Sequence, residues 1–316
     1  MIALADFFHY STIALLVCVS AIGVGLGQGL IGIDALQAMH IQPQAAGAIT
    51  RLCVLGMALL EFAAISGLTL AMFLLFSSST ITLYTGIAEL GIAAALAITG
   101  LVIGFASYFP ASRACRSLAR QPFFAQQILR FMLLSQSIIQ TPIVFGFIIA
   151  MFIKMQVANA TNLADALRLL AGGLCIGIGS IGPALGLAHF AKTACESVGV
   201  NRQAYPKLLS FTFISQAIIE TPILFALLLS LIILSSSAHD TMLHAIAMLS
   251  SALCIGIGTF GPGFSSGRIA AAACQEIALA PENHSYLSRV SMFGQGLVDT
   301  GAIYAFLIAI LIYFFR

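Results

Sequence analysis

Charged side chains are scarce in this sequence. They make up 8% of its 316 residues, whereas 60% of the residues are hydrophobic, and an ordinary soluble domain carries about 25% charged residues. A chain with so few charges cannot cover itself with a polar surface, so we expect an integral membrane protein. The formal net charge of +2 also lacks the basic excess that marks a nucleic-acid-binding protein.

Several site-forming patterns are absent as well. No CxxC pair occurs, and Cys115, Cys195 and Cys274 recur at nearly equal spacing, so we interpret them as packing residues. The histidines lie near segment ends, so we expect no metal cluster and no cofactor. The glycine-rich stretches have no preceding strand and no following Lys-Ser/Thr, which excludes a nucleotide-binding loop. Met1 to Asp6 lack a basic n-region, so the start is interpreted as a membrane helix rather than a cleaved signal.

Long apolar runs are what the sequence does contain. Eight of them follow one another, each about 30 residues long, whereas roughly 20 residues span the hydrocarbon. Because the bilayer core offers no water to backbone groups, each run is expected to be a helix. The sequence therefore predicts an all-α membrane protein with eight transmembrane helices. The runs cover residues 11–39, 46–76, 84–118, 126–156, 165–198, 205–235, 243–278 and 285–315.

A polar residue marks the middle of every second run. Glu61, Gln140, Glu220 and Asp299 are separated by 79, 80 and 79 residues. A regular period of that size indicates one structural unit copied four times. We therefore predict four tandem helical hairpins, which cover residues 1–80, 81–160, 161–238 and 239–316.

Three of these positions carry a carboxylate in the middle of an apolar helix. A charge at that depth costs at least ~2.5–3.5 kcal/mol, so such a residue is a functional hypothesis by default. The alternative, a protonated packing residue, is weakened because Glu61, Glu220 and Asp299 share one repeat position. Gln140 cannot take up and release a proton near neutral pH. We therefore expect three ion sites from four hairpins.

Basic residues gather at the turn inside each hairpin. Ten of the 13 Lys and Arg residues lie there, which by the positive-inside rule predicts that the turns face the cytoplasm and both termini the opposite side. The ten are Arg51, Arg113, Arg116, Arg120, Arg130, Lys192, Arg202, Lys207, Arg268 and Arg289, and the other three are Lys154, Arg168 and Arg316.

The first helix of each hairpin is rich in glycine, and that of hairpin two is the poorest. Because glycine lowers helix stability, such a run needs a reason, and close helix contact in lipid is the usual one. Glycines recur every two to four residues, for example at Gly172, Gly173, Gly177 and Gly179. This pattern favours a helix crowded on several sides, as on the inner wall of a narrow ring. Generic packing in a polytopic transporter is the alternative.

These features together resemble the c subunit, or proteolipid, of rotary ATP synthases, fused in tandem. The resemblance rests on the glycine-rich first helix, on the loop Ala119-Arg120-Gln121-Pro122, and on the key residue 18 positions after the loop proline. That spacing holds in every hairpin, at 43 to 61, 122 to 140, 202 to 220 and 281 to 299. Hairpin one keeps Gln42-Pro43 and hairpin four keeps Pro281, whereas hairpin three has diverged to Asn201-Arg202.

The resemblance implies a ring of identical chains that is not itself catalytic. First helices would line the inside and carboxylate helices the outside, next to lipid and to the stator a subunit. Each carboxylate would bind a proton or Na⁺ while facing lipid and release it at a stator arginine. Loss of water favours the neutral acid and a nearby cation favours the ionised form, which agrees with that role. The loop residues Gln42, Pro43, Arg120, Gln121, Pro122, Arg202 and Pro281 would face the central stalk.

The transported ion is less evident. Sodium-type members pair the carboxylate with a following Ser/Thr and with a Gln on the glycine helix. Thr221, Thr300 and the supporting hydroxyl of Tyr304 fit this pattern, but Phe62 follows Glu61. The ligand set is mixed, so we expect protons rather than Na⁺. The glycine-helix position holds Gln28, Ser107, Leu187 and Ser266; Thr141 follows Gln140; and Gln136, Gln216 and Gln295 could compensate from one turn before the key position.

Two other functions stay open at this point. A V-type-like proteolipid of an ATP-driven pump is favoured by fused hairpins and a missing carboxylate, whereas the Arg-Gln-Pro loop favours the F-type. An eight-helix secondary transporter would carry broken helices, and Pro142 and Pro222 could kink the helices two residues after the key position. Equal periods in four tandem hairpins argue against the transporter.

Overall fold

The computed structural model describes residues 2–77, 81–236 and 241–315, which are almost entirely helical. Eight of its helices or helix pairs are long and apolar enough to cross a membrane, and they confirm the predicted fold class. The long helices are α1 (Ile2–Ile41), α2 (Ala46–Leu75), α3 (Leu83–Ala106), α4 (Tyr108–Arg120), α5 (Ala125–Ile139), α6 (Thr141–Gln156), α7 (Leu163–Gly179), α8 (Ile181–Val200), α9 (Tyr205–Ser235), α10 (Met242–Gly258), α11 (Phe260–Leu279) and α12 (His284–Phe314).

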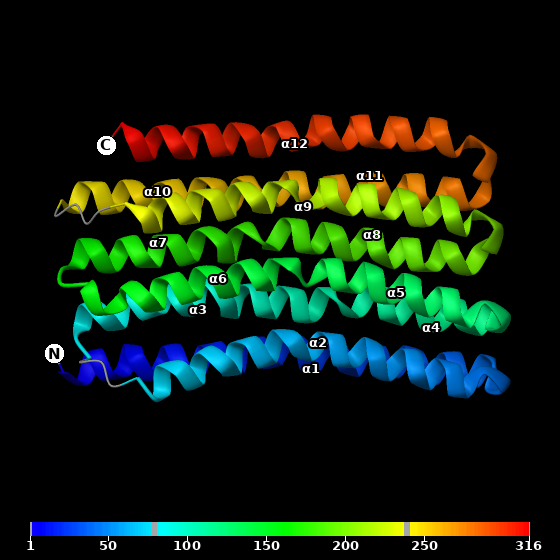
Figure 1. The fold of residues 1–316 in the computed structure, drawn as a ribbon, viewed down its shortest axis with the longest axis horizontal. Coiled ribbons are helices and arrows are strands. Elements are labelled where there is room, and N and C mark those ends of the chain that lie inside the picture. The colour runs from blue at the N-terminus through cyan, green and yellow to red at the C-terminus, as the bar shows by residue number, and fades with distance from the viewer. Residues whose placement is uncertain (1, 78–80, 237–240, 316) are drawn as a thin grey trace.

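Short 3₁₀ turns close the hairpins at one end of the molecule. They are η1 (Pro43–Ala45), η2 (Pro122–Phe124), η4 (Arg202–Ala204) and η5 (Pro281–Asn283), and η3 (Val157–Asn159) follows α6 at the opposite end. Three of the four hairpin turns begin at a proline, whose fixed φ suits the first position of a turn and ends the preceding helix. Both chain termini lie at the end opposite these turns (Figure 1).

Some predicted positions fall outside the described residues. The boundary at 80 lies at residues 78–80 and the one at 238 lies within 237–240, and Arg316 also lies outside. The boundary at 160 falls between η3 and α7. The helices on either side of each gap run in opposite directions (Figure 1).

The first helices of successive hairpins pack side by side in one row. α1 packs on α3, α3 on α7 and α7 on α10, and at the turn end α4 packs on α8 and α8 on α11. Glycine permits this approach: a Cβ at Gly173 would overlap the Gly91 carbonyl group, and one at Gly177 would overlap that of Ala94. The second helices, α2, α5–α6, α9 and α12, lie against this row and contact one another in the same order.

Helix breaks occur where proline removes a backbone donor. α3 ends before Ser107, α7 before Ser180 and α10 before Thr259, and each break precedes a proline by three residues. α5 and α6 are separated at Gln140, two residues before Pro142. Pro222 lies inside α9 without interrupting it, so the expected kink occurs in hairpin two and not as a break in hairpin three.

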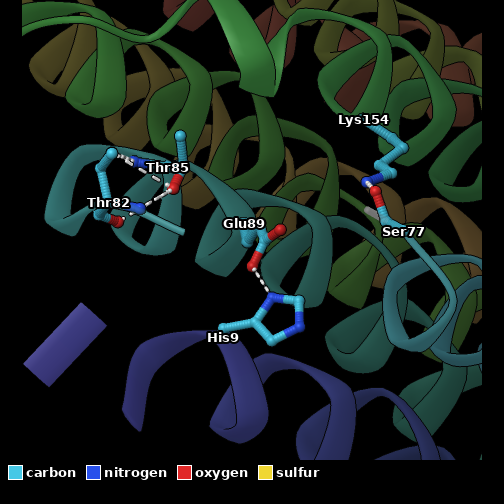
Figure 2. Close-up of polar contacts among 6 residues, drawn as sticks. All are labelled: His9, Ser77, Thr82, Thr85, Glu89 and Lys154. Carbon is cyan, nitrogen blue, oxygen red and sulfur yellow. Dashed lines mark hydrogen bonds and ion pairs between the residues drawn. The ribbon is translucent and has the colours of Figure 1, made fainter. Parts of the chain in front are cut away.

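Polar contacts join neighbouring hairpins at both ends. At the end with the termini, His9 Nδ1 lies 2.7 Å from Glu89 Oε2 in a buried pair between α1 and α3, and Lys154 Nζ donates to Ser77 Oγ at 2.8 Å (Figure 2). A capping box of Thr82 and Thr85 starts α3 beside this pair (Figure 2). The His9–Glu89 and Lys154–Ser77 contacts tie hairpin one to hairpin two at this end.

Candidate functional site

The four key positions lie at one height in the bundle. Each is fifteen residues after the start of its second helix: 46 to 61, 125 to 140, 205 to 220 and 284 to 299. At a rise of 1.5 Å per residue, this places all four about 22 Å from the turn end. Because the second helices run alongside one another (Figure 1), these four positions define one belt across the bundle.

In hairpin one the structure brings Gln28 and Glu61 together. Gln28 Nε2 donates to Glu61 Oε1 at 3.1 Å and to the Met57 carbonyl oxygen at 3.3 Å. The amide on the glycine helix α1 therefore contacts the carboxyl group on α2. Glu61 itself is exposed, because no further hairpin lies on that side of α2.

In hairpin two the key position is a fixed amide. Gln140 is 7% exposed, and its Nε2 donates to Ser107 Oγ at 2.9 Å. Ser107 holds the same repeat position as Gln28, so the two hairpins use equivalent pairs of positions. An amide bound in this way has no group that exchanges a proton near neutral pH.

In hairpins three and four the carboxyl groups are less fully partnered. Glu220 Oε1 and Asp299 Oδ1 are buried without a hydrogen-bond partner among the described residues. The Thr141 hydroxyl of hairpin two lies against the Glu220 carboxyl group and can donate to it. The neighbour of this carboxylate is thus supplied by the preceding hairpin, which sequence reasoning did not anticipate.

The predicted hydroxyl partners within hairpins three and four point elsewhere. Thr221 donates to its own helix at the Ala217 carbonyl oxygen, 3.4 Å away. Thr300 donates to the Leu297 carbonyl oxygen at 2.7 Å. Tyr304 lies on the surface of α12 and is 67% exposed. The structure therefore brings none of these three hydroxyl groups onto the carboxylate of its own hairpin.

Three glutamines one turn before the key position cross to the preceding hairpin. Gln136 Nε2 donates to the Gly56 carbonyl oxygen at 2.9 Å and to that of Ser107 at 3.1 Å. Gln216 Nε2 donates to the Ser135 carbonyl oxygen at 3.2 Å. Gln295 Nε2 lies 3.4 Å from Ser215 Oγ and 3.0 Å from Ser291 Oγ. All three side chains are fully buried.

The loop residues also reach across hairpins. Gln121 Nε2 donates to the Gly199 carbonyl oxygen at 2.8 Å, and Asn201 Nδ2 donates to that of Ala278 at 2.9 Å. Asn201 belongs to the diverged loop of hairpin three but not to the residues expected to face the stalk, although its place one residue before Arg202 corresponds to Gln121 before Pro122. Arg120 lies 3.7 Å from Glu196.

A groove of about 440 Å³ opens between the second and third loops. Arg120 and Arg202 line it together with Phe123, whose side chain is fully exposed. The predicted loop residues of hairpins two and three thus share one surface. Gln42 and Pro43 begin the turn of hairpin one, and Pro281 begins that of hairpin four.

Comparison with known proteins fits this belt of hairpins. The family model for the ATP synthase C subunit matches residues 170–233 and 249–312, in tandem. The ATP synthase c subunit 2 of Cereibacter sphaeroides is 41% identical over 68 residues, which are 22% of this chain and 82% of that protein. The chain belongs to the family of ATP synthase c subunits.

Other members of the family align over a similar length. The ATP synthase c subunit of Mesomycoplasma hyopneumoniae strain J is 35% identical over 79 residues, 25% of this chain and 77% of the relative. That of Dehalococcoides mccartyi strain BAV1 is 32% identical over 71 residues, 22% of this chain and 93% of the relative. Each alignment is about as long as one repeat. The resemblance drawn from the sequence is therefore confirmed, and the chain is a multi-pass membrane protein built of c-type hairpins in tandem.

Proposed function

We propose that this chain is a rotor-ring component of a rotary ATP synthase that carries protons on Glu61, Glu220 and Asp299. The observation that carries the proposal is the belt of four key positions at one height, three of them acidic. A carboxyl group away from water is stable in its neutral form and ionises when a cation approaches. Each charge that crosses the membrane supplies about 2.3 kcal/mol per 100 mV, which can drive rotation.

The hydroxyl neighbours are distributed in a way that supports three working sites. Glu220 has the Thr141 hydroxyl of the preceding hairpin beside it. The residue at the same repeat position before Asp299 is Thr221, whose hydroxyl donates in this structure to the Ala217 carbonyl oxygen of its own helix. The residue that would serve Gln140 is Phe62, which has no hydroxyl. The carboxylate replaced by Gln140 and the hydroxyl replaced by Phe62 thus belong to the same interface, the one between hairpins one and two. Hairpin two therefore carries no ion in this proposal.

Identical chains would complete the ring. Gly25 and Gly29 on α1 and Gly261 on α11 have nothing within 4 Å of an added Cβ, whereas Gly104, Gly267 and Gly182, at the equivalent positions, pack tightly on neighbouring hairpins. These open glycines lie on the two outer edges of the row. A second copy, added with the same packing, would cover them, and it would bring its Thr300 to Glu61. A closed ring of such head-to-tail contacts is the expected assembly.

The remaining partners follow from membership in a rotor ring of this family. The stator a subunit would meet the carboxylates, the central stalk would meet the hairpin loops, and the chain would have no catalytic role of its own. The loops would face the cytoplasm, as the basic residues predict. The missing carboxylate also favours a second function: fewer ions per turn suit an ATP-driven pump, for which the same ring would run in reverse.

Carbodiimide labelling of the purified oligomer tests this function. We expect modification of Glu61, Glu220 and Asp299 and of no other membrane carboxyl group, with no protection by Na⁺. Protection by Na⁺ would show that the chain carries Na⁺ and not protons. A monomer without reactive carboxyl groups would refute the rotor-ring function and would favour an eight-helix secondary transporter.

A further inference from the structure

The fully buried glutamines Gln136, Gln216 and Gln295 each have a side-chain amide whose nitrogen is hydrogen-bonded and whose oxygen is not. Their Nε2 groups donate across the interface between hairpins to the preceding hairpin. Their Oε1 atoms are buried and have no partner among the described residues. A buried acceptor without a donor costs free energy, so each such group in a native structure calls for an explanation.

In hairpins three and four a second unpartnered oxygen lies one turn further along the same helix. Gln216 precedes Glu220 by four residues, and Gln295 precedes Asp299 by four residues. Residues four apart lie on one face of a helix, about 6 Å from each other. Glu220 Oε1 and Asp299 Oδ1 are also unpartnered within the described part of the chain, as is Gln140 Oε1 in hairpin two, where the amide cannot take up a proton. Each site therefore presents two buried acceptor groups, which is the arrangement that one bound proton would satisfy.

Hairpin one also has an amide beside its carboxylate, but a different helix provides it. The position equivalent to Gln216 is Met57, which has no amide. There the amide comes from Gln28 on the glycine helix, and it contacts the carboxyl group of Glu61 and the backbone of Met57. Every carboxylate in the belt thus has one carboxamide within about one helical turn of it, although the helix that provides it differs.

Charged side chains offer no alternative partner within the described ranges. The ion pairs found there are His9–Glu89, Arg116–Asp34 and Arg120–Glu196, and none of them includes a belt carboxylate. The polar neighbour of Glu220 on the adjacent helix is the Thr141 hydroxyl group. The glycine-helix positions next to the two sites hold Leu187 and Ser266, so neither provides an amide.

We propose that the Oε1 atoms of Gln216 and Gln295 hold the transported proton on their carboxyl groups. This rests on the proposed function. On loading, a proton adds to the carboxylate of Glu220 or Asp299, and the resulting O–H donates to the amide oxygen one turn earlier. On release the proton leaves, the hydrogen bond breaks and the carboxylate re-forms. The amide nitrogen keeps its bond to the preceding hairpin throughout, which holds the oxygen in place.

The test compares three substitutions in the intact oligomer: Gln216→Met, Gln295→Met and Gln136→Met. Methionine is the residue that hairpin one has at this position. Gln136→Met is the matched control, because it removes the same cross-hairpin bond but precedes no carboxylate. Each oligomer is labelled with dicyclohexylcarbodiimide, which reacts with the protonated acid, at about pH 6 and about pH 9, and modification is mapped by mass spectrometry.

Gln216→Met should lower the labelling of Glu220 at the higher pH about threefold to tenfold relative to the lower pH, because the neutral acid loses one hydrogen bond. Asp299 should be unchanged in that variant, and Gln295→Met should give the reverse result. An unchanged ratio, or an equal fall at Glu220 in Gln136→Met, would overturn the proposal and leave only a packing role. If wild-type Glu220 and Asp299 label at no pH, the proposed function itself fails.

Discussion

Hairpins two and three share a backbone plan but differ in one belt position. Both have a first helix that breaks three residues before a proline, a loop amide that bonds to the next hairpin, and a buried glutamine that reaches back. Hairpin two has an amide, Gln140, whose nitrogen donates to Ser107, whereas hairpin three has an acid, Glu220; each of the two side chains has one oxygen that is unpartnered among the described residues. The comparison teaches that the packing between hairpins is the same whether the belt position holds an amide or an acid.

The largest expected effect comes from breaking the seam that the two hairpins share. Gly177→Leu would drive a side chain into the Ala94 carbonyl group, so α3 and α7 could not approach and the chain should fail to fold. Gly25→Leu, at an open position, should leave the monomer folded and prevent the oligomer. Size-exclusion chromatography in detergent separates the two results, with Gly47→Leu as an exposed control. An oligomer of normal size from Gly25→Leu would contradict the ring edge.

Converting hairpin three into a second hairpin two should abolish much of the transport. Glu220→Gln replaces the acid by an amide of the same size, so the fold should be retained while carbodiimide labelling falls from three sites per chain to two. Proton uptake by reconstituted complex is the measurement. Transport at the wild-type rate would mean that Glu220 is a packing residue.

The opposite conversion sharpens the comparison. Gln140→Glu should add a fourth reactive carboxyl group, and one that stays protonated to a higher pH than Glu220, because Phe62 of the preceding hairpin has no hydroxyl to donate to the ionised form. Adding Phe62→Thr should lower its labelling at high pH about threefold to tenfold, the worth of one hydrogen bond. Equal labelling with and without Phe62→Thr would show that the preceding hairpin does not serve the site.

A smaller effect is expected at the far end of hairpin two. Glu89 is buried against His9, whereas the equivalent residue of hairpin three is Leu169. Glu89→Ala would leave the imidazole buried without its partner and should lower the free energy of unfolding by about 1–3 kcal/mol. Glu89→Gln keeps an acceptor and should cost less. Unfolding in sodium dodecyl sulfate provides the measurement, and equal midpoints for both variants would argue against the pair.

Much of this architecture could be predicted from the sequence. The lengths of the apolar runs and the period of the key residues predict the eight helices, the family and a common height for Glu61, Gln140, Glu220 and Asp299, because the rise of a helix per residue is constant. The expectation that Gln140 carries no ion follows from the chemistry of an amide. These are properties of one helix or one side chain and need no knowledge of neighbours.

Only the tertiary structure decided which hairpin contacts which side chain. The sequence suggests that a hydroxyl next to a carboxylate in the chain serves that carboxylate, yet Thr221 and Thr300 bond to their own helices and Thr141 lies against Glu220. Likewise Gln136, Gln216 and Gln295 turn to the preceding hairpin. Such choices depend on the rotation and lateral order of packed helices, and a repeat with the same spacing is compatible with either neighbour.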